Sequence, residues 1–417
     1  MLYHLFQWLE ASYDLKGAGL FRYITFRAGG AVVISLLISM VFGGQIVQFL
    51  KRLQVGETIR DLGLEGQKEK EGTPTMGGVI IIMAIMIPCL LMADLTNVYV
   101  LLMLLATTWM GIIGFIDDYI KVFRKNKQGL SGKFKILGQV GLGAIVAVTM
   151  LFHEDVYVRM DLEEAEAKGY EVIEVISSHD AAGQTIELAN VRTTLTNVPF
   201  MKGNRFDYCQ LLWFLGKNSA TLVWIVFIPF VILIVTAVSN AANLTDGIDG
   251  LATGVSGIIG ATLGALAYVS GNSIAANYLG ILHLPGTSEL VIFSACFLGA
   301  CIGFLWYNAY PAQVFMGDTG SLTLGGIIAA LAIVLRKELL IPIMCGIFVV
   351  ENLSVMIQVG YFKYTRYRFG EGRRVFLMSP LHHHYQKKGI PEPKIVTRFW
   401  IIGILLAVVT ILTLKIR

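Results

Sequence analysis

The sequence predicts an all-α polytopic membrane protein: a helical bundle of about ten spans with a small β-rich extracytoplasmic insertion. Hydrophobic residues make up 55% of the chain and charged residues 15%, and the mean hydropathy of +0.67 is too high for a soluble globular domain. Apolar runs of about 20 residues recur along the chain, and a helix of this length crosses the hydrocarbon core of a bilayer. Stretches such as residues 31–40 do not alternate with polar residues, as barrel strands would.

The spans follow one another without a soluble domain boundary, repeat or low-complexity tract, so residues 1–417 are expected to form a single integral membrane domain. The first 22 residues mix Glu10, Asp14 and Lys16 with aromatic residues and lack the apolar core of a secretory signal. We expect them to form an amphipathic lead-in to the first span. The ten expected spans lie near residues 23–50, 76–94, 98–118, 135–152, 219–240, 250–270, 288–307, 321–335, 339–360 and 398–416.

Lysine and arginine are concentrated in three connecting loops. Residues 51–73 hold five of these cations, residues 119–135 hold six and residues 361–398 hold nine, whereas residues 271–287 hold none. Short loops rich in Lys and Arg stay in the cytoplasm, and the three basic loops follow odd-numbered spans. We therefore expect these loops to be cytoplasmic and both termini to lie outside.

The longest loop lies on the side predicted to be outside. Residues 153–219 contain β-branched residues in partial alternation, at Val156–Arg159, Glu171–Ile176 and Gln184–Leu188, with turn residues between them. They predict a small β-rich insertion. Its end, Phe206–Leu215, is amphipathic and aromatic, which suits a membrane interface.

Acidic residues end several of the apolar runs, where charge is costly and usually marks a functional site. Asp117 and Asp118 close the third span, Asn243-Leu-Thr-Asp246-Gly-Ile-Asp249-Gly250 follows the fifth, and Asp318 follows the seventh. By span parity all of these motifs face the cytoplasm. They therefore predict one shared site built from several loops.

Carboxylates and lysines occur together in this predicted site. One or two carboxylates, with substrate phosphates and water, are the ligands that Mg²⁺ takes, and lysines hold phosphate. The combination indicates a metal-assisted phosphate site, although Asp117-Asp118 can also be a solvated helix end and Asp318 a helix N-cap. The lysines beside the acidic motifs are Lys70, Lys121, Lys125 and Lys133.

Three adjacent histidines, His382-His383-His384, lie in the last basic loop behind Met378-Ser-Pro-Leu. Such a run can bind a soft metal, but no cysteine or carboxylate spacing that would complete that kind of site accompanies it. We expect the histidines to position a phosphate or a sugar.

Together these motifs resemble the phospho-N-acetylmuramoyl-pentapeptide transferase family over essentially the whole chain. The acidic motifs also resemble the wider superfamily of polyprenyl-phosphate N-acetylhexosamine-1-phosphate transferases. The histidine motif narrows the resemblance to the muramoyl-pentapeptide branch of that superfamily. The motifs are Asp117-Asp118, Asn243 to Gly250, Phe315-Met-Gly-Asp318-Thr-Gly-Ser-Leu, Pro380-Leu-His-His-His and Thr73-Pro-Thr-Met-Gly-Gly.

The resemblance implies a reaction and its participants. In the bacterial cytoplasmic (inner) membrane, such an enzyme transfers phospho-N-acetylmuramoyl-pentapeptide from UDP-N-acetylmuramoyl-pentapeptide to undecaprenyl phosphate, forming lipid I and UMP in peptidoglycan synthesis, with Mg²⁺ required. It implies a homodimer surrounded by membrane lipid, and no nucleic-acid partner. Two departures from the family pattern are the length of the 153–219 insertion and Tyr385-Gln386, where an aromatic residue followed by an acid is common.

The resemblance also implies roles for single residues. Asp318 and Asp246 are the expected metal ligands, Asp117 is expected to deprotonate or orient the lipid phosphate with Asp118 beside it, and His382 completes the catalytic set. Phe315 is expected to stack on uracil, because an aromatic face suits a flat base. The other expected substrate-binding residues are Lys70, Lys121 and Lys133 for phosphates, Asn243 and Asn308 for the nucleotide, and His383 for the donor pocket.

Two other functions fit parts of the sequence. A transferase for UDP-N-acetylglucosamine or a related sugar would keep the aspartates but lack Pro380-Leu-His-His-His. A transporter would carry charges near the bilayer midplane and an inverted repeat, and the sequence shows neither. For the transferase, direct attack by the lipid phosphate is favoured over an aspartyl intermediate, because a lipid phosphate is already anionic near pH 7.

Overall fold

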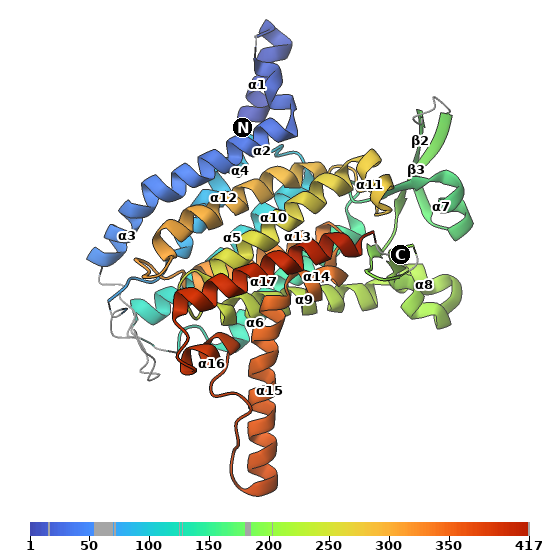
Figure 1. The fold of residues 1–417 in the computed structure, drawn as a ribbon. Coiled ribbons are helices and arrows are strands. Elements are labelled where there is room, and N and C mark those ends of the chain that lie inside the picture. Colours follow the sequence, from blue (N-terminus) through green and yellow to red (C-terminus); the bar gives the residue numbers. More distant parts are fainter. Residues whose placement is uncertain are drawn as a thin grey trace.

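The computed structural model describes residues 1–15, 17–53, 70, 72–124, 126, 128–179, 185–201 and 203–415. These residues form a helical bundle with a small β-containing unit at one end (Figure 1). The predicted fold class is therefore confirmed. Of the residues named above, Lys16, Lys125 and Gln184 lie outside the described part of the chain.

Eight helices of the described chain are long and apolar enough to cross a membrane. They are Ile24–Arg52, which joins α2 (Ile24–Leu37), the π-helical turn η2 (Ile38–Phe42) and α3 (Gly43–Arg52); α5 (Val98–Val122); α6 (Gly132–Phe152); Ser219–Thr245, which joins α8 (Ser219–Leu222) and α9 (Trp224–Thr245); α10 (Leu251–Gly271); Thr287–Asn308, which joins η5 (Thr287–Glu289) and α12 (Leu290–Asn308); α13 (Gly317–Val334); and α17 (Glu392–Thr413).

The two remaining expected spans differ from a simple long helix. The first is α4 (Gly78–Met92), which has 15 residues and contains Pro88. The second is broken, because η6 (Glu338–Leu340) and α14 (Ile341–Met344) meet α15 (Gly346–Phe369) at an angle of 78°. Cys345 at the break has a ψ of 24°, outside the α-helical range. Beyond the break, α15 projects from the flank of the bundle (Figure 1).

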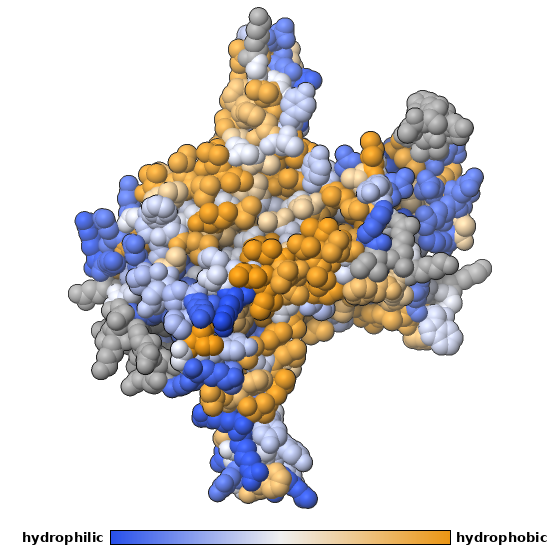
Figure 2. Space-filling model, viewed as in Figure 1, coloured by the Kyte–Doolittle hydropathy of each residue, from blue (hydrophilic) through white to orange (hydrophobic). Residues whose placement is uncertain are grey.

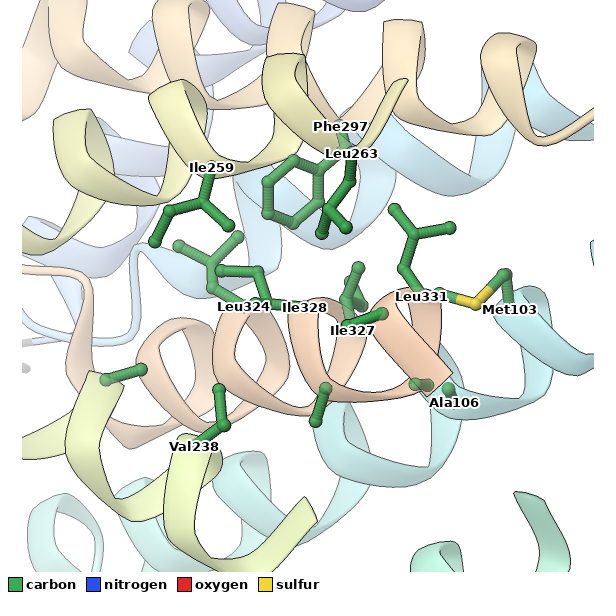
Figure 3. Close-up of a cluster of buried hydrophobic side chains, with 14 of the residues drawn as sticks. Met103, Ala106, Val238, Ile259, Leu263, Phe297, Leu324, Ile327, Ile328 and Leu331 are labelled. Carbon is green, nitrogen blue, oxygen red and sulfur yellow. The ribbon is translucent and has the colours of Figure 1, made fainter. Parts of the chain in front are cut away.

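The shortest expected span is the central helix of the bundle. In α13, 89% of the residues are buried. Its side chains Leu324, Ile327, Ile328 and Leu331 face α10, α12 and α5, and Val238 of α9 lies on the opposite side of the helix (Figure 3). The helix begins at Gly317, four residues earlier than expected, so the predicted Asp318 lies in its first turn. A helix of 18 residues is about 27 Å long, and α13 therefore connects the two polar ends of the bundle.

The predicted β-rich insertion is present. Strands β1 (Val158–Asp161), β2 (Glu171–His179) and β3 (Thr185–Arg192) form an antiparallel sheet in the order β1-β3-β2, and β4 (Leu195–Asn197) pairs with β5 (Arg205–Asp207). Helix α7 (Leu162–Lys168), which was not predicted, packs on the three-stranded sheet. The 3₁₀ segment η4 (Tyr208–Asn218) leads back into the bundle.

The surface of the bundle matches a membrane protein with several spans. Figure 2 shows hydrophobic residues across the middle of the bundle and hydrophilic residues at its two ends. Helix α17, for example, exposes Ile401, Ile404, Leu405 and Leu412. The remaining short elements are α1 (Leu2–Tyr13), η1 (Ala18–Arg22), α11 (Ser273–Leu279) and α16 (Leu381–Lys387).

Candidate active site

Three carboxylates meet where α5 ends and α13 begins. Carboxylate oxygens of Asp117, Asp118 and Asp318 all lie within 4.8 Å of one another. The two helices approach this closely because Gly114 of α5 has no side chain: a Cβ there would lie 2.3 Å from the carbonyl oxygen of Asp318. Successive residues of an α-helix project about 100° apart, so the side chains of Asp117 and Asp118 contact different neighbours.

Asp118 caps the N-terminus of α13. Its Oδ2 accepts hydrogen bonds from the backbone N–H of Thr319 at 2.8 Å and the Thr319 hydroxyl at 2.6 Å, and its Oδ1 accepts from the N–H of Asp318 at 3.1 Å. The first N–H groups of a helix have no partner within the helix, and a carboxylate also suits the positive end of the helix dipole. Asp118 therefore fixes the position of Asp318.

Two lysines lie between Asp117 and Asp318. Lys121 Nζ is 2.5 Å from Asp117 Oδ2 and 3.1 Å from Asp318 Oδ2. Lys135 Nζ is 3.0 Å from Asp117 Oδ1 and 2.5 Å from Asp318 Oδ2. Three carboxylates thus face two ammonium groups, and the cluster keeps an excess of negative charge when all five groups are ionised.

The lysine that α6 contributes is Lys135, not the predicted Lys133. Lys133 is exposed and makes no ion pair with any residue in the described part of the chain. Two positions along a helix correspond to a rotation of about 200°, so the two side chains point to opposite sides. Helical periodicity could have identified Lys135 once α6 was known to begin at Gly132.

The predicted Asn243 also reaches the cluster. Its Nδ2 donates hydrogen bonds to Asp318 Oδ1 at 2.9 Å and to the hydroxyl of Ser321 at 2.8 Å. Asp246, the other predicted metal ligand, lies at the C-terminal end of α9 and is not a member of the carboxylate group. Among the described residues, the group that could hold a metal is Asp117, Asp118 and Asp318.

The predicted Lys70 belongs to a second polar cluster. Its Nζ lies 2.7 Å from Asp249 Oδ1 and 2.6 Å from Glu392 Oε1. Glu392 also accepts a hydrogen bond from the backbone N–H of Asp249 at 2.7 Å. Lys70 is therefore held by Glu392 of α17 and by Asp249 of the α9–α10 loop. The sequence did not reveal Glu392 as a site residue.

Asn308 lies beside this second cluster, and Phe315 lies in the segment that leads from Asn308 to α13. Asn308 is buried, and its Oδ1 accepts hydrogen bonds from the N–H of Gly250 at 3.1 Å and the hydroxyl of Thr253 at 3.2 Å, while its Nδ2 donates to the carbonyl of Val314 at 3.0 Å. It therefore ties the α9–α10 loop to the segment before α13. Phe315 is half-buried, and its backbone pairs with Pro74 and Gly77 of the early motif.

His382 is oriented by a carboxylate of α15. Its Nδ1 lies 3.1 Å from Glu351 Oε2, and its backbone N–H donates to Glu351 Oε1 at 3.2 Å. Its Nε2 is buried and has no hydrogen-bond partner among the described residues. The ring lies against the α9–α10 loop, since a Cβ added to Gly247 would be 2.2 Å from Nε2.

His383 connects the histidine motif to the Lys70 cluster. Its Nδ1 lies 2.7 Å from Gln386 Oε1, and Gln386 Nε2 donates to Glu392 Oε2 at 3.3 Å. Burial, together with the neighbouring His382 and Lys70, lowers the pKa of His383 to about 4. The ring is therefore neutral at physiological pH. Gln386, one of the departures from the family pattern, is part of this network.

Comparisons with known proteins agree with the motifs. Residues 70–82 match Phospho-N-acetylmuramoyl-pentapeptide-transferase signature 1, and residues 184–336 match Glycosyl transferase family 4. A curated Phospho-N-acetylmuramoyl-pentapeptide-transferase of Flavobacterium psychrophilum is 59% identical over 417 residues, covering 100% of both chains. Relatives of the same name from Parabacteroides distasonis and Amoebophilus asiaticus are 56% and 54% identical with the same full coverage.

The chain belongs to the phospho-N-acetylmuramoyl-pentapeptide transferase family. Membership confirms the resemblance and the enzyme class that the motifs predicted. Because the alignment with the Flavobacterium psychrophilum transferase covers both chains completely, it also includes the insertion at residues 153–219. The site residues that the sequence did not single out in this transferase are Lys135, Glu351 and Glu392. Gln386 was noted only as a departure from the family pattern, and the structure places it in the network.

Proposed function

We propose that this transferase uses UDP-N-acetylmuramoyl-pentapeptide as donor and undecaprenyl phosphate as acceptor. An oxygen of the lipid phosphate bonds to the sugar-linked phosphorus of the donor, the bond from that phosphorus to the bridging oxygen breaks, and UMP leaves with that oxygen. The products are lipid I and UMP. The observation that carries this proposal is the cluster of Asp117, Asp118 and Asp318 with Lys121 and Lys135.

The acidic cluster fits a Mg²⁺ ion. Its ligand atoms are hard carboxylate oxygens, and its three negative charges exceed the two positive charges of the lysines. One or two carboxylates are enough to bind Mg²⁺ when substrate phosphates supply other ligands. Asp318 and Asp117 are the residues that would hold the ion, because Asp118 is occupied in capping α13. When bound, Mg²⁺ would neutralise charge on the transferring phosphate. Asp246 precedes Gly247, which packs on His382, and we assign it to the donor side instead.

The two lysines have a separate task in this proposal. Each ammonium group lies within hydrogen-bond distance of both Asp117 and Asp318 and can exchange a carboxylate for a phosphate oxygen. Positioning two phosphates for in-line displacement supplies much of the rate enhancement of phosphoryl transfer. Asp117 would orient the lipid phosphate between them, in a direct reaction without an aspartyl intermediate.

The donor would lie on the second polar cluster. Lys70, His383 and the half-buried Phe315 would line this side of the site, with uracil expected on the Phe315 ring. Asn308 would act differently from the sequence expectation. Its amide is occupied by Gly250, Thr253 and Val314, so it would shape the nucleotide pocket through the loops that it joins.

An apolar hollow beside α9 is consistent with a binding site for the lipid acceptor. It has a volume of about 180 Å³ and lies between α9 and the broken span, lined by Ala237, Val238, Ala241, Ile341, Cys345, Phe348, Val349, Asn352 and Leu353. Ala241 lies two residues before Asn243, which donates to Asp318. A polyprenyl chain along this wall of α9 would place its phosphate near the acidic cluster.

The cellular arrangement is also part of the proposal. The protein would lie in the inner membrane with the acidic cluster and the basic loops on the cytoplasmic side and both termini outside, as the positive-inside rule predicts. A homodimer is expected by analogy with the family, and light scattering of the purified protein in detergent would test it.

The test of the proposed function is donor discrimination. The protein is purified in detergent with Mg²⁺ and undecaprenyl phosphate, UDP-N-acetylmuramoyl-pentapeptide and UDP-N-acetylglucosamine are offered separately, and UMP is measured. We expect UMP from the muramoyl donor alone. UMP from the other donor alone would contradict the assignment of the histidine motif, and no UMP from either would contradict the function.

A further inference from the structure

A run of three charged residues is buried at the end of the bundle away from the acidic cluster. Arg336, Lys337 and Glu338 connect α13 to α14, and their relative exposures are 2%, 0% and 3%. Burying charge is costly unless it is paired and hydrogen-bonded. Because α13 separates this charged turn from Asp318 by about 27 Å, the turn has no direct part in the proposed chemistry.

The insertion supplies the partners of the charged turn. Asn197 of β4 accepts a hydrogen bond from Lys337 Nζ at 2.5 Å, and its backbone N–H donates to the carbonyl of Arg336 at 3.0 Å. The hydroxyl of Thr196 donates to the same carbonyl at 3.0 Å. Tyr208, directly after β5, donates to Glu338 Oε1 at 2.9 Å. The β4–β5 hairpin (Leu195–Asp207), together with the following Tyr208, thus contacts every residue of the turn.

The backbone of the turn depends on these contacts. Arg336 has a φ of 55°, in the left-handed region that a side chain with a Cβ rarely adopts. Such a conformation persists only where the surroundings determine it strongly. The same hairpin also contacts the end of α17, since Asn204 Nδ2 donates to the carbonyl of Leu414 at 2.7 Å.

The charged turn leads directly into one wall of the apolar hollow. Glu338 begins η6, Ile341 follows as the first residue of α14, and Ile341, Cys345, Phe348 and Val349 face the α9 wall across the hollow. The connection from the turn to α14 is short, so a rotation of the turn would move α14 and, through the break at Cys345, α15. The position of the α14–α15 wall is therefore set where the insertion holds the turn.

We propose that the insertion is a clamp that sets the width of the lipid-acceptor groove through the Arg336–Glu338 turn, with Thr196, Asn197 and Tyr208 as its positioning residues. The clamp rests on the contacts above, and its link to the acceptor rests on the proposed function. The insertion then acts on the reaction from the end of the bundle opposite the acidic cluster.

The test removes two hydroxyl groups from the clamp with little change in volume. In Thr196→Val/Tyr208→Phe the turn loses the hydrogen bonds to Arg336 and Glu338, whereas Thr196→Ser keeps the first of them. Val175→Thr, on the exposed strand β2 of the same insertion, is a control. Spin labels carried by unnatural amino acids at the exposed positions Leu233 of α9 and Met356 of α15 report the distance across the groove in the full chain.

We expect the double variant to broaden this distance distribution and to raise the KM for undecaprenyl phosphate by about fivefold. The KM for the nucleotide donor should stay within about twofold of wild type, as should both values in Thr196→Ser and Val175→Thr. A purely structural role would lower thermal stability and kcat without a selective change in the acceptor KM, and that result would overturn the proposal.

Two further outcomes keep the test decisive. If the double variant does not fold, Tyr208→Phe alone carries the same measurement, and an unchanged distance distribution in that variant overturns the clamp. If the wild-type protein releases no UMP at all, the proposed function fails, and the distance measurement still decides whether the insertion holds the groove walls apart at a fixed spacing.

Discussion

Glu351 Oε2 lies 3.1 Å from His382 Nδ1, and both side chains are fully buried. The carboxylate also accepts the backbone N–H of His382, so it fixes both the start of α16 and the rotation of the ring. A partner on one ring nitrogen determines what the other nitrogen presents. Nε2 is thereby turned toward Gly247 in the Asn243–Gly250 motif.

Glu351→Gln should therefore lower kcat/KM for UMP release. The substitution keeps the shape of the side chain but removes its charge, and a hydrogen bond to a charged group contributes about 2 kcal/mol, or about 30-fold in rate. Glu371→Gln, in the exposed loop after α15, is the matched control and should leave the rate unchanged. Equal rates for Glu351→Gln and wild type would show that the ring does not need this partner.

Lys135 and Lys133 provide a second matched pair. Lys135→Met removes an ammonium group shared by Asp117 and Asp318, whereas Lys133→Met changes an exposed side chain on the opposite side of the same helix turn. We expect Lys135→Met to lose at least about tenfold in kcat/KM and Lys133→Met less than about twofold. Steady-state UMP release measures both, and a larger loss in Lys133→Met would contradict the site as described.

Substitutions at Asp318 and Asp118 should have different effects, the first on catalytic activity and the second on the stability of the fold. Asp318→Asn should abolish turnover while membrane insertion and thermal unfolding stay close to wild type. Asp118→Asn turns an amide toward N–H groups that need an acceptor, and we expect it to destabilise the protein by about 1–3 kcal/mol. Thermal unfolding followed by tryptophan fluorescence gives the comparison. Near-normal turnover in Asp318→Asn would refute Asp318 as a metal ligand.

Removal of divalent cations should abolish UMP release, and added Mg²⁺ should restore it. A ligand that binds only the folded state also stabilises that state. Mg²⁺ should therefore raise the unfolding temperature of the wild-type protein in the absence of substrate and leave that of Asp318→Asn unchanged. An equal rise in both proteins would place the ion outside the acidic cluster.

The depressed pKa of His383 predicts a pH dependence of stability. Its pKa is about 4 in the folded protein and about 6.5 in an unfolded chain. As the pH falls from 6.5 to about 4, the unfolded state binds this proton before the folded state does, so stability decreases through this window. The unfolding temperature of wild type should fall more steeply than that of His383→Asn, with His153→Asn as an exposed control. Parallel curves for all three proteins would contradict the assignment.

The sequence was sufficient for the helical class, the insertion and the acidic motifs, because each depends on composition or on residues close together in the chain. Asp117-Asp118 and Asp318 stand at the ends of apolar runs, where a charge is conspicuous. The sequence named Lys133, whereas the structure places Lys135 beside Asp117 and Asp318, because the start of α6 decides which lysine faces inward.

Other parts of the site depend on contacts between distant segments. Glu351 and Glu392 are single carboxylates in apolar helices, and their partners are 31 and 322 residues away. No local pattern specifies such pairs. The Arg336-Lys337-Glu338 run did carry a local signal, since three charges stand between two apolar spans. Their burial beneath the insertion requires the tertiary structure.

The most direct test of the central claim is the dependence of UMP release on the lipid acceptor. Purified protein with Mg²⁺ and UDP-N-acetylmuramoyl-pentapeptide is titrated with undecaprenyl phosphate, in parallel with Asp318→Asn. We predict no UMP without acceptor, one UMP for each lipid I formed as acceptor is added, and none at any concentration in the variant. Release of UMP in the rigorous absence of acceptor would contradict direct attack by the lipid phosphate at the Asp117–Asp118–Asp318 cluster.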